Sequence, residues 1–147
     1  MLRFACYDKF GYQDFYQKHP TDVGYDLRSA EEVLIYPGEI KLISTGLYIK
    51  PYDSEYSIDI RSRSGLTLKG LVVLNAPGTI DPAYSDEVKV IMANFGDWVQ
   101  KIAKGDRIAQ MVIHKIERAG FVKVNKTKFN TLSQQDRNGG FGSSGVK

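Results

Sequence analysis

The sequence predicts an all-β fold, either a sandwich, a jelly roll or a barrel, formed by one domain. Segments in which apolar and polar residues alternate recur along the 147-residue chain, and this alternation is typical of strands that bury one face. Glycine and proline separate the segments at close spacing, as in sandwiches and barrels. Patterns with the helical period are scarce, and no internal repeat or linker divides the chain.

The first half of the chain alternates in five places, separated by one loop and several turns. The segment from Phe10 to His19 is aromatic and polar without a clear period, so we expect a loop there. Pro37-Gly38 signals a turn, and the long segment after it is apolar on parts of both faces. The expected strands are Leu2 to Tyr7, Gly24 to Leu27, Glu31 to Tyr36, Ile40 to Ile49 and Tyr56 to Arg61.

The second half continues the alternation after a helical turn expected from Ser64 to Lys69, and we expect at most this one short helix. The stretch from Asn75 to Tyr84 holds Pro, Gly and Asp-Pro between two strand-like segments, which predicts a β-hairpin or a tight corner. The expected strands are Leu71 to Leu74, Glu87 to Asn94, Trp98 to Ile102, Arg107 to Ile116 and Phe121 to Val124.

The corner carries two side chains that a plain turn does not need. Asp81 supplies a carboxylate, and Tyr84 supplies an aromatic ring three residues later. An Asp-Pro pair also begins ordinary turns, because Asp hydrogen-bonds the backbone that follows it. Taken alone, the corner is consistent with a structural turn and with a functional site.

The last segment of the chain changes in composition. Residues 139–145 are too glycine-rich to order themselves, since glycine loses the most backbone entropy on folding. We therefore expect a β domain over residues 1–129 and a flexible C-terminal segment of that domain over residues 130–147. Gly140, Gly142 and Gly145 spell G-x-G-x-x-G, but no strand precedes them and no helix follows, so this is no dinucleotide fingerprint. Backbone amides beside Arg137 suit an anion such as a phosphate.

Composition narrows the function classes. The formal net charge of +3 is too small to indicate a nucleic-acid partner, and lysine and arginine do not cluster. The single cysteine, Cys6, rules out an intrachain disulfide and favours a reducing compartment. No metal-ligand spacing links Cys6, His19 and His114. The sequence shows neither a secretory signal pattern nor an apolar run of membrane length, so we expect a soluble cytoplasmic protein without membrane or direct nucleic-acid partners.

Five short motifs follow one another from Val23 to the C-terminal region. They are Val23 to Leu27, Arg63 to Leu66, Gly78 to Tyr84, Gly105 to Gln110 and Arg137 to Gly145. Each match is weak alone, but five in this order and spacing are specific. Together they resemble the five ordered motifs of the homotrimeric dUTPase family, the dUTP pyrophosphatases.

The resemblance implies a distorted jelly-roll (β-clip) subunit that assembles as a homotrimer, with shared active sites at the subunit interfaces. It implies hydrolysis of dUTP to dUMP and pyrophosphate by attack of water on the α-phosphate, with Mg²⁺ on the triphosphate. This activity limits uracil incorporation into DNA and supplies dUMP for dTMP synthesis. In-line attack by water needs a carboxylate base, together with donors for the developing negative charge.

By resemblance, the corner holds the catalytic base, the uracil reader and the sugar gate. Asp81 matches the base, which orients and deprotonates the water. Tyr84 matches the residue whose ring packs on the deoxyribose and excludes a 2′-hydroxyl. The uracil pocket leaves no room for the methyl group of thymine, which gives specificity by exclusion. The residues that match the uracil reader are Asn75, Gly78, Thr79 and Ile80.

By resemblance, two further motifs hold the triphosphate and its metal ion. Gln110 matches the glutamine whose amide contacts the region of the α-phosphate. Asp26 matches a carboxylate that meets Mg²⁺ through water, since Mg²⁺ keeps part of its hydration shell; a purely structural role for Asp26 is equally open. The second motif donates hydrogen bonds to phosphate oxygens, through Arg63, Ser64 and Gly65.

The tail matches a lid that orders on binding and excludes all water except the attacking molecule. Arg137 matches the residue that meets the γ-phosphate, and Phe141 matches the ring that stacks on uracil. The remaining substrate-binding positions of the tail are Gly142, Ser143 and Ser144.

Three positions depart from the family pattern. Asp22-Val23 stands where the family usually has Ser-Ala or Ala. Ser62 replaces the usual proline, so we expect the backbone before Arg63 to be less pinned. Ser85-Asp86 replaces the usual Arg/Gln-Gly, which puts the tight turn there in doubt and adds a negative charge near the triphosphate. We expect the local backbone, and not the chemistry, to differ.

Two other functions stay open. The dCTP deaminase relatives of the same fold, some of them bifunctional, have a signature similar to Ile80 to Ser85. Their reaction needs a glutamate where this chain has Ile91, and they lack a tail of this type. The second function is regulatory, with a partner protein bound at the aromatic segment Tyr7 to Tyr16 and nucleotide acting as a switch. Packing of that segment on a sheet or on a neighbouring subunit is the simpler interpretation.

Overall fold

The computed structural model describes residues 2–15, 17 and 19–132, and the chain separates into two units. Unit 1 is formed by residues 1–117, and unit 2 begins at Arg118. The change in composition suggests a later boundary, at residue 129, because it marks the glycine-rich stretch and not the point where the backbone leaves the sheets. No helix of the described residues is long and apolar enough to cross a membrane.

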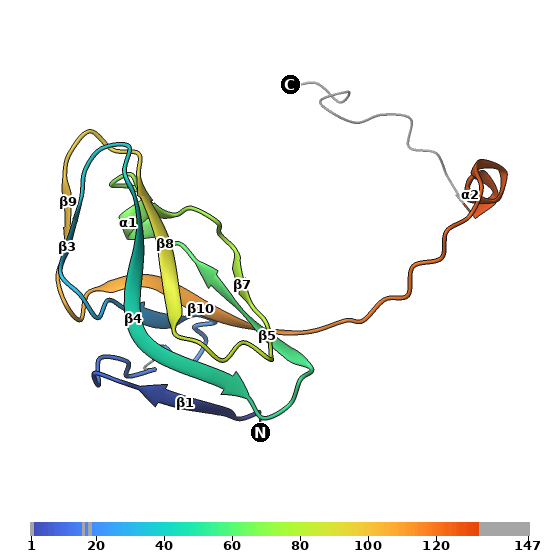
Figure 1. Ribbon diagram of the computed structural model, residues 1–147, viewed down its shortest axis with the longest axis horizontal. Helices are drawn as coiled ribbons and strands as arrows, with labels where there is room; N and C mark the ends of the chain where they lie inside the picture. Colours follow the sequence, from blue (N-terminus) through green and yellow to red (C-terminus); the bar gives the residue numbers. More distant parts are fainter. Residues whose placement is uncertain (1, 16, 18, 133–147) are drawn as a thin grey trace. The chain divides into compact units, whose positions relative to one another are not determined.

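Unit 1 is built from antiparallel strands in two four-stranded sheets and one two-stranded sheet (Figure 1). The strands are β1 (Phe4–Asp8), β2 (Tyr25–Arg28), β3 (Val33–Ile35), β4 (Ile40–Pro51), β5 (Tyr56–Arg61), β6 (Leu71–Val73), β7 (Gly78–Ile80), β8 (Val88–Asn94), β9 (Gln100–Ile102) and β10 (Arg107–Lys115). The first sheet has the order β1-β4-β8-β6, the second has the order β2-β10-β5-β7, and β3 pairs with β9. The prediction of an all-β, jelly-roll-like subunit is confirmed.

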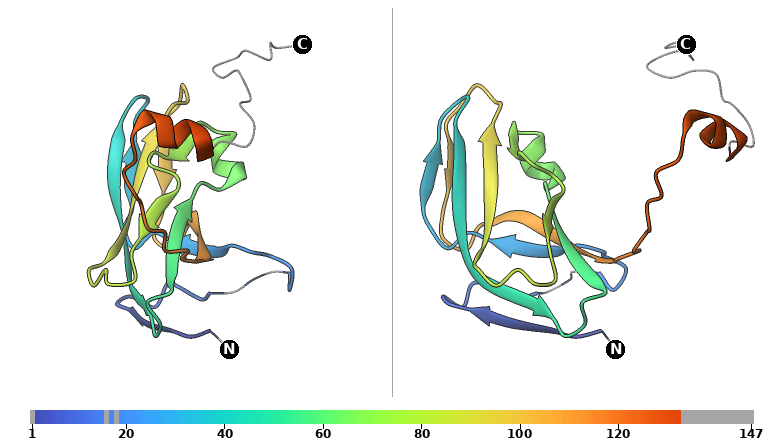
Figure 2. Two further views of the ribbon diagram at one scale, coloured as in Figure 1. Left: turned by 90° about the vertical axis from the view of Figure 1, so that its right-hand side faces the viewer. Right: turned by 45° about the vertical axis from the view of Figure 1, so that its right-hand side comes forward.

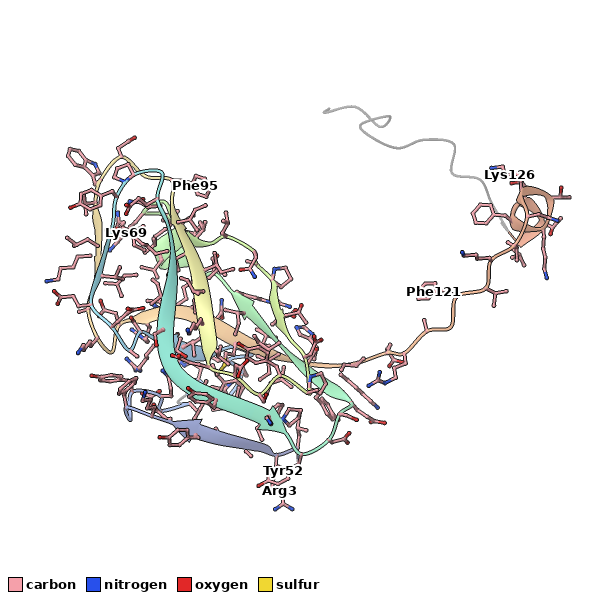
Figure 3. All side chains as sticks on the ribbon, in the orientation of Figure 1. Arg3, Tyr52, Lys69, Phe95, Phe121 and Lys126 are labelled. Atoms are coloured by element: carbon pink, nitrogen blue, oxygen red, sulfur yellow. The ribbon has the colours of Figure 1, made fainter. Side chains whose placement is uncertain are left out.

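The strands of the first sheet run across those of the second (Figure 2). Strand β4 connects β1 to the rest of the first sheet, because its first half pairs with β8 and its second half pairs with β1. At the end of the β1–β4 pair, Tyr52 donates its backbone N–H to the carbonyl oxygen of Arg3 at 3.1 Å, and the two side chains lie close together (Figure 3). This pairing holds the N-terminal strand on the edge of the sheet.

Strand β4 contains a bulge near the end of its pairing with β8. The ladder to β8 shifts between Ser44 and Leu47, so that Thr45 and Gly46 have no partner residues in β8. Gly46 adopts a φ of +70°, which glycine reaches without strain. Because the bulge adds two residues, it keeps the alternation of β4. Ile43 and Leu47 point to one side and are buried, while Ile40 and Leu42 on the other side are exposed.

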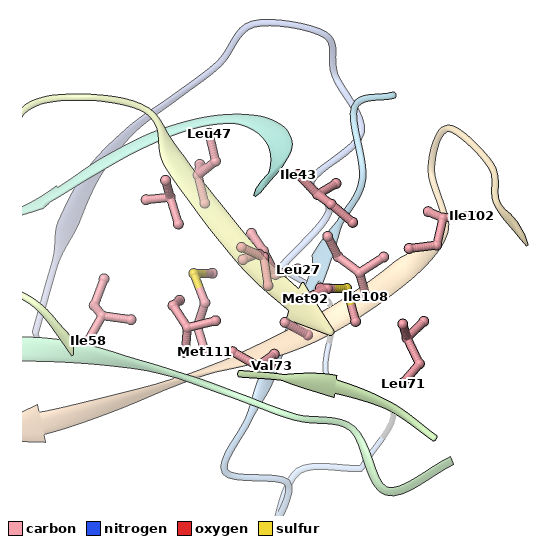
Figure 4. Packing of buried hydrophobic residues seen from close by; sticks show 14 of the residues in the cluster. Leu27, Ile43, Leu47, Ile58, Leu71, Val73, Met92, Ile102, Ile108 and Met111 are labelled. Carbon is pink, nitrogen blue, oxygen red and sulfur yellow. The ribbon is translucent and has the colours of Figure 1, made fainter. Parts of the chain in front are cut away.

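The core lies between the sheets and draws aliphatic side chains from all three of them (Figure 4). Leu27 of β2, Ile43 of β4 and Ile35 of β3 are completely buried. Burying one such side chain contributes about 1.5–3 kcal/mol to stability. Because β2, β5 and β10 each bury one face in this core, their pairing register is fixed. Their outward faces carry the site.

The loop from residue 9 onward packs on its own chain. The Asp8 carboxylate accepts the backbone N–H groups of Phe10, Gly11 and Gln13. The Gln13 amide nitrogen then donates to the carbonyl oxygens of Arg28 and Thr45, at 3.0 and 2.9 Å. Gln13 thus bridges the two four-stranded sheets, which agrees with the simpler interpretation of the aromatic segment.

The described residues contain two short helices, one more than expected. Helix α1 (Ser64–Thr67) is the expected turn, and helix α2 (Lys126–Leu132) lies in unit 2. Asn125 caps α2, since its Oδ1 accepts the backbone N–H of Lys128 at 2.9 Å. The prediction of a strand from Phe121 to Val124 was wrong, because these residues form no strand in the single chain. The described residues supply no ladder partner there, and the Phe121 side chain is 96% exposed.

Candidate active site

The predicted site residues of unit 1 line two separate cavities. The larger one, of about 710 Å³, contains five of them: Asp26, Arg63, Ser64, Gly65 and Gln110. The smaller one, of about 250 Å³, contains the other six: Asn75, Gly78, Thr79, Ile80, Asp81 and Tyr84. The division follows the resemblance. The residues that match phosphate and metal binding line one cavity, and those that match the base, the uracil reader and the sugar gate line the other.

Asp26 is the electrostatic centre of the larger cavity. Its Oδ1 lies 2.9 Å from Nε of Arg63, and its Oδ2 lies 3.1 Å from Nη1 of Arg107. Arg63 also donates from Nη1 to the carbonyl oxygen of Arg107 at 3.1 Å. Two guanidinium groups are therefore held together by one carboxylate on the wall of the cavity, where they can meet an anion.

Gln110 lies on β10, the strand next to β2 and β5. It is the direct cross-strand partner of Asp26 on β2 and of Arg61 on β5, so the three side chains share one face of the sheet. Its Nε2 donates to the carbonyl oxygen of Ser62 at 3.0 Å. A Cβ atom at Gly24 would collide with the Gln110 side chain, so glycine at that position gives the amide its place.

Ser62 pins the backbone that we expected to be loose without the usual proline. Its hydroxyl oxygen accepts the backbone N–H of Val73 at 2.8 Å, and its carbonyl oxygen accepts the Gln110 amide. A proline at this position would keep the carbonyl group but lose the hydroxyl. The serine therefore supports this backbone through its hydroxyl, where a proline would fix φ through its ring.

Ser64 and Gly65 form the start of α1, directly after Arg63. The carbonyl oxygen of Arg63 accepts the backbone N–H groups of Leu66 and Thr67, both at 3.0 Å. The N–H groups at the very start of a helix have no acceptor within the helix. Ser64 and Gly65 are exposed at the cavity, so their N–H groups and the serine hydroxyl are available to a ligand.

The smaller cavity is formed at the corner between the two sheets. Strand β6 belongs to the first sheet and β7 to the second, so the chain makes a tight corner there and not a hairpin. Gly78 is buried, and a Cβ atom on it would press against the Asn75 side chain at 3.0 Å. The absence of a side chain at Gly78 therefore sets the position of the Asn75 amide. Thr79 is tied to β5, since its Oγ1 donates to Oδ1 of Asp59 at 3.1 Å.

Asp81 and Tyr84 lie on the tight turn that leaves the corner. The Tyr84 backbone N–H donates to the Asp81 carbonyl oxygen at 3.0 Å, and the Asp81 side chain is exposed. The Tyr84 hydroxyl donates to the carbonyl oxygen of Glu87 at 2.9 Å, while 37% of Tyr84 is exposed. One carboxylate and one anchored ring thus face solvent beside the same cavity. Asp86 adopts no positive φ, so this turn does not require a glycine.

Sequence reasoning missed Glu87, which holds the corner to the bulge of β4. Its Oε1 accepts hydrogen bonds from the Ser44 hydroxyl and from the backbone N–H groups of Thr45 and Gly46. Burial raises the pKa of the Glu87 carboxyl, but these hydrogen bonds and the charge of Lys89 outweigh it, so the pKa lies below its ordinary value of 4.5. The sequence contained one signal for this contact, because a glycine inside a strand, here Gly46, often marks a bulge.

The residues predicted in the tail lie outside the described residues. They are Arg137, Phe141, Gly142, Ser143 and Ser144.

Two aspartates line the larger cavity, and Asp26 is the one that matches a metal-binding position, while Asp22 accepts the backbone N–H of His19 at 3.0 Å. The described residues contain no group of three or more His, Cys, Asp or Glu side chains that could hold one. Asp26 has a 23% exposed side chain on the cavity wall. One carboxylate fits a Mg²⁺ ion that is held mainly by a polyphosphate and keeps part of its water shell.

Comparisons with known proteins point to one family. The profile described as dUTPase matches residues 12–145. A Clostridium tetani protein named deoxyuridine 5′-triphosphate nucleotidohydrolase is 47% identical over 130 residues, which are 86% of this chain and 85% of that protein. A Thermobifida fusca protein of the same name is 46% identical over 130 residues, 86% of this chain and 69% of that protein.

Solved structures give the same result. The dUTPase of Staphylococcus bacteriophage 80alpha with dUpNHpp superposes with a TM-score of 0.83 at 28% identity, covering 98% of this chain and 99% of that one. A mutant dUTPase of phage phi11 of S. aureus, described as coordinating a structural Mg(II) ion, has a TM-score of 0.75 at 24% identity. It covers 84% of this chain and 97% of that one, and at this identity it supports the fold alone.

Proposed function

Because this chain belongs to the dUTPase family and is a dUTP diphosphatase, we propose that it cleaves dUTP by in-line attack of water on the α-phosphate, with Asp81 as the base. The products are dUMP and pyrophosphate. The single observation that carries the proposal is the exposed Asp81 carboxylate beside the anchored ring of Tyr84, in a cavity of about 250 Å³.

Asp81 takes a proton from the attacking water and orients it. A base must reach the water through a hydrogen bond, and an exposed carboxylate on a tight turn is placed for this task. Tyr84 packs on the deoxyribose, and its ring leaves no room for a 2′-hydroxyl group. Anchoring of its hydroxyl on the Glu87 carbonyl at 2.9 Å supports this role, because a fixed ring excludes better than a mobile one.

The residues of the larger cavity hold the phosphates. Arg63 and the start of α1, at Ser64 and Gly65, donate to phosphate oxygens, and Gln110 donates to the α-phosphate. Charge-assisted donors of this kind stabilise the charge that develops during phosphoryl transfer. Asp26 would hold Mg²⁺ through the water shell of the ion, and the ion would neutralise part of the triphosphate charge.

We propose that three copies assemble and that each active site combines cavities from different copies. The two sets of site residues line separate cavities of one chain, so a single chain does not unite them in one cavity. Exposed apolar residues supply contact area for such an assembly. Among them are Leu42, which is 60% exposed at the rim of the smaller cavity, and Phe121 and Val122 in unit 2.

The lining of the smaller cavity supports dUTP hydrolysis and argues against deamination of dCTP. Ile91 lines it together with Asp81, and an aliphatic side chain at this position cannot transfer the protons that deamination of dCTP requires. Absence of ammonia release from dCTP would be consistent with this assignment, and its presence would overturn it.

The tail completes the site as a lid, with Arg137 on the γ-phosphate, Phe141 on uracil, and Gly142, Ser143 and Ser144 as further donors. Truncation after Gln135 is expected to slow turnover strongly without unfolding unit 1. An unchanged rate would overturn the lid.

The cellular role follows from the products. Removal of dUTP limits uracil incorporation into DNA, and dUMP feeds dTMP synthesis. The single cysteine remains the support for a cytoplasmic location. A regulatory partner at the aromatic segment remains testable by pull-down of partners with and without nucleotide, using a deletion of residues 10–17.

One experiment tests the proposed function: pyrophosphate release measured side by side for dUTP, dTTP, dCTP and UTP. Release from dUTP is expected to exceed release from the others by at least about a hundredfold. The methyl group of dTTP and the 2′-hydroxyl group of UTP clash with the pocket, and dCTP has an amino group where uracil has a carbonyl oxygen. Equal rates for dUTP and dTTP would overturn the uracil assignment of the corner.

A further inference from the structure

The larger cavity contains one cation that none of the five motifs includes. Arg61 lines it together with Arg63 and Gln110. It is the last residue of β5, and its side chain is on the same face of the sheet as that of its cross-strand partner Gln110. Its side chain is 44% exposed, so the guanidinium group is accessible from the cavity.

The other two arginines of the cavity share one counter-ion. Arg63 and Arg107 contact Asp26 at 2.9 and 3.1 Å. Their charge is therefore partly compensated before any ligand arrives. A triphosphate carries several negative charges, and a third arginine would raise the positive charge where the phosphates bind.

Arg61 contacts one carboxylate and one imidazole, and its contact with the carboxylate is long. Its Nη2 lies 3.5 Å from Oδ2 of Asp59, which is longer than the contacts that Arg63 and Arg107 make with Asp26. The same Nη2 lies 2.8 Å from Nε2 of His114, and that nitrogen lies 3.2 Å from Oδ2 of Asp59. Nε2 accepts from Arg61 or donates to Asp59, but it cannot do both with one proton position. His114 can therefore satisfy Asp59 when Arg61 turns away.

We propose that Arg61 is a further triphosphate-binding residue, which leaves Asp59 and His114 and donates to phosphate oxygens when nucleotide occupies the cavity. The inference rests on the proposed function. A guanidinium group donates two parallel hydrogen bonds to a phosphate, which is a stronger acceptor than an imidazole nitrogen. Asp59 keeps partners after the move, because Thr79 donates to its Oδ1 at 3.1 Å and His114 is within reach of its Oδ2.

The test compares a triphosphate with a monophosphate. Binding of dUpNHpp and of dUMP is measured by titration calorimetry, with Mg²⁺ present, for the wild-type protein, Arg61→Gln, Arg61→Lys and Arg3→Gln. Arg3→Gln is the matched control, because it removes the same charge from a distant part of unit 1. Arg3 lies beside Tyr52 at the end of β4, far from Lys69, which comes shortly after helix α1 (Figure 3).

Arg61→Gln is expected to weaken binding of dUpNHpp about tenfold, as loss of a charged hydrogen bond does, and to change binding of dUMP by less than about twofold. Arg61→Lys is expected to fall between Gln and wild type, because it keeps the charge but not the planar fork. Arg3→Gln is expected to match the wild type for both ligands. If Arg61→Gln does not fold, the same comparison made with Arg61→Lys decides.

Two results would overturn the inference. The first is unchanged dUpNHpp affinity in folded Arg61→Gln, and the second is an equal loss of affinity for dUpNHpp and dUMP, which would make Arg61 a structural residue. Either can occur while the wild-type protein releases pyrophosphate from dUTP, and then the proposed function stands. A wild-type protein that binds no dUpNHpp would instead overturn the proposed function and this inference with it.

Discussion

The side-chain amide of Gln110 donates to the carbonyl oxygen of Ser62 at 3.0 Å, and so ties β10 to the turn that carries the phosphate-type residues. The hydroxyl oxygen of the same serine accepts the backbone N–H of Val73 at 2.8 Å, which ties that turn to β6 of the other sheet. Ser62 is therefore the residue where the phosphate cavity joins the strand that leads into the corner.

Ser62→Ala is expected to lower the free energy of unfolding by about 1–2 kcal/mol, because it leaves the buried N–H of Val73 without its acceptor. Urea unfolding followed by tryptophan fluorescence measures the change. Ser85→Ala, at an exposed position, is the control and should stay within about 0.5 kcal/mol of wild type. Equal stability of the two variants would contradict the role of the Ser62 hydroxyl.

Stability is expected to fall in acid because of Glu87. Its pKa is lowered in the folded protein from an ordinary value of 4.5, so its charged form stabilises the fold at neutral pH. This contribution is complete above pH 4.5 and is lost as the pH falls through the lower folded pKa. Glu87→Gln is expected to destabilise the protein at pH 7 by about 1–3 kcal/mol and to flatten the acid limb of the stability curve.

Unfolding measured from pH 3 to pH 7 tests this prediction. Glu32→Gln is the matched control, since the Glu32 side chain is 60% exposed and pairs with Lys101 at 3.3 Å, which contributes little at a surface. An acid limb of the same slope in Glu87→Gln and in wild type would assign the acid sensitivity to other carboxyl groups.

Asp81→Asn is expected to reduce kcat at least about a hundredfold, because the amide keeps the shape but cannot accept the proton of the water. Binding of dUpNHpp should change little, since the base acts on water and not on the ligand. Steady-state kinetics and calorimetry on the same preparation separate the two effects. Loss of binding would make Asp81 a structural residue of the corner.

Tyr84→Ala is expected to narrow the ratio of kcat/KM for dUTP over UTP by about tenfold or more, because it removes the ring that excludes the 2′-hydroxyl. Tyr84→Phe keeps the ring and loses only the hydrogen bond to the Glu87 carbonyl. It should retain most of the discrimination. A ratio unaltered in the alanine variant would move the sugar gate elsewhere.

Much of the fold could be predicted because its strands bury one face and expose the other. Alternation located β4, β5, β8 and β10 to within a few residues. The strand predicted from Phe121 to Val124 failed for a physical reason. Alternation indicates that a segment can pair in a sheet, but it does not show that a partner strand exists. The described residues of the chain supply no partner for residues 121–124.

The candidate site was predictable where its chemistry lies in short motifs, such as Asp81 and Tyr84 three residues apart. It was not predictable where partners come from distant strands. The Glu87 carboxylate meets the backbone N–H of Gly46 across 41 residues of sequence. The hydrogen bond of Ser62 was not predictable either, because only the fold brings the N–H of Val73 to the serine hydroxyl.

The division of the site residues over two cavities has a consequence for inheritance. In the proposed trimer, a chain with a damaged corner still lends an intact phosphate cavity to a neighbour. Two inactive variants, one defective in each cavity, would therefore complement one another when mixed. A chain defective in both cavities would inactivate the sites that it shares with wild-type chains. An allele that encodes such a chain would therefore be dominant negative.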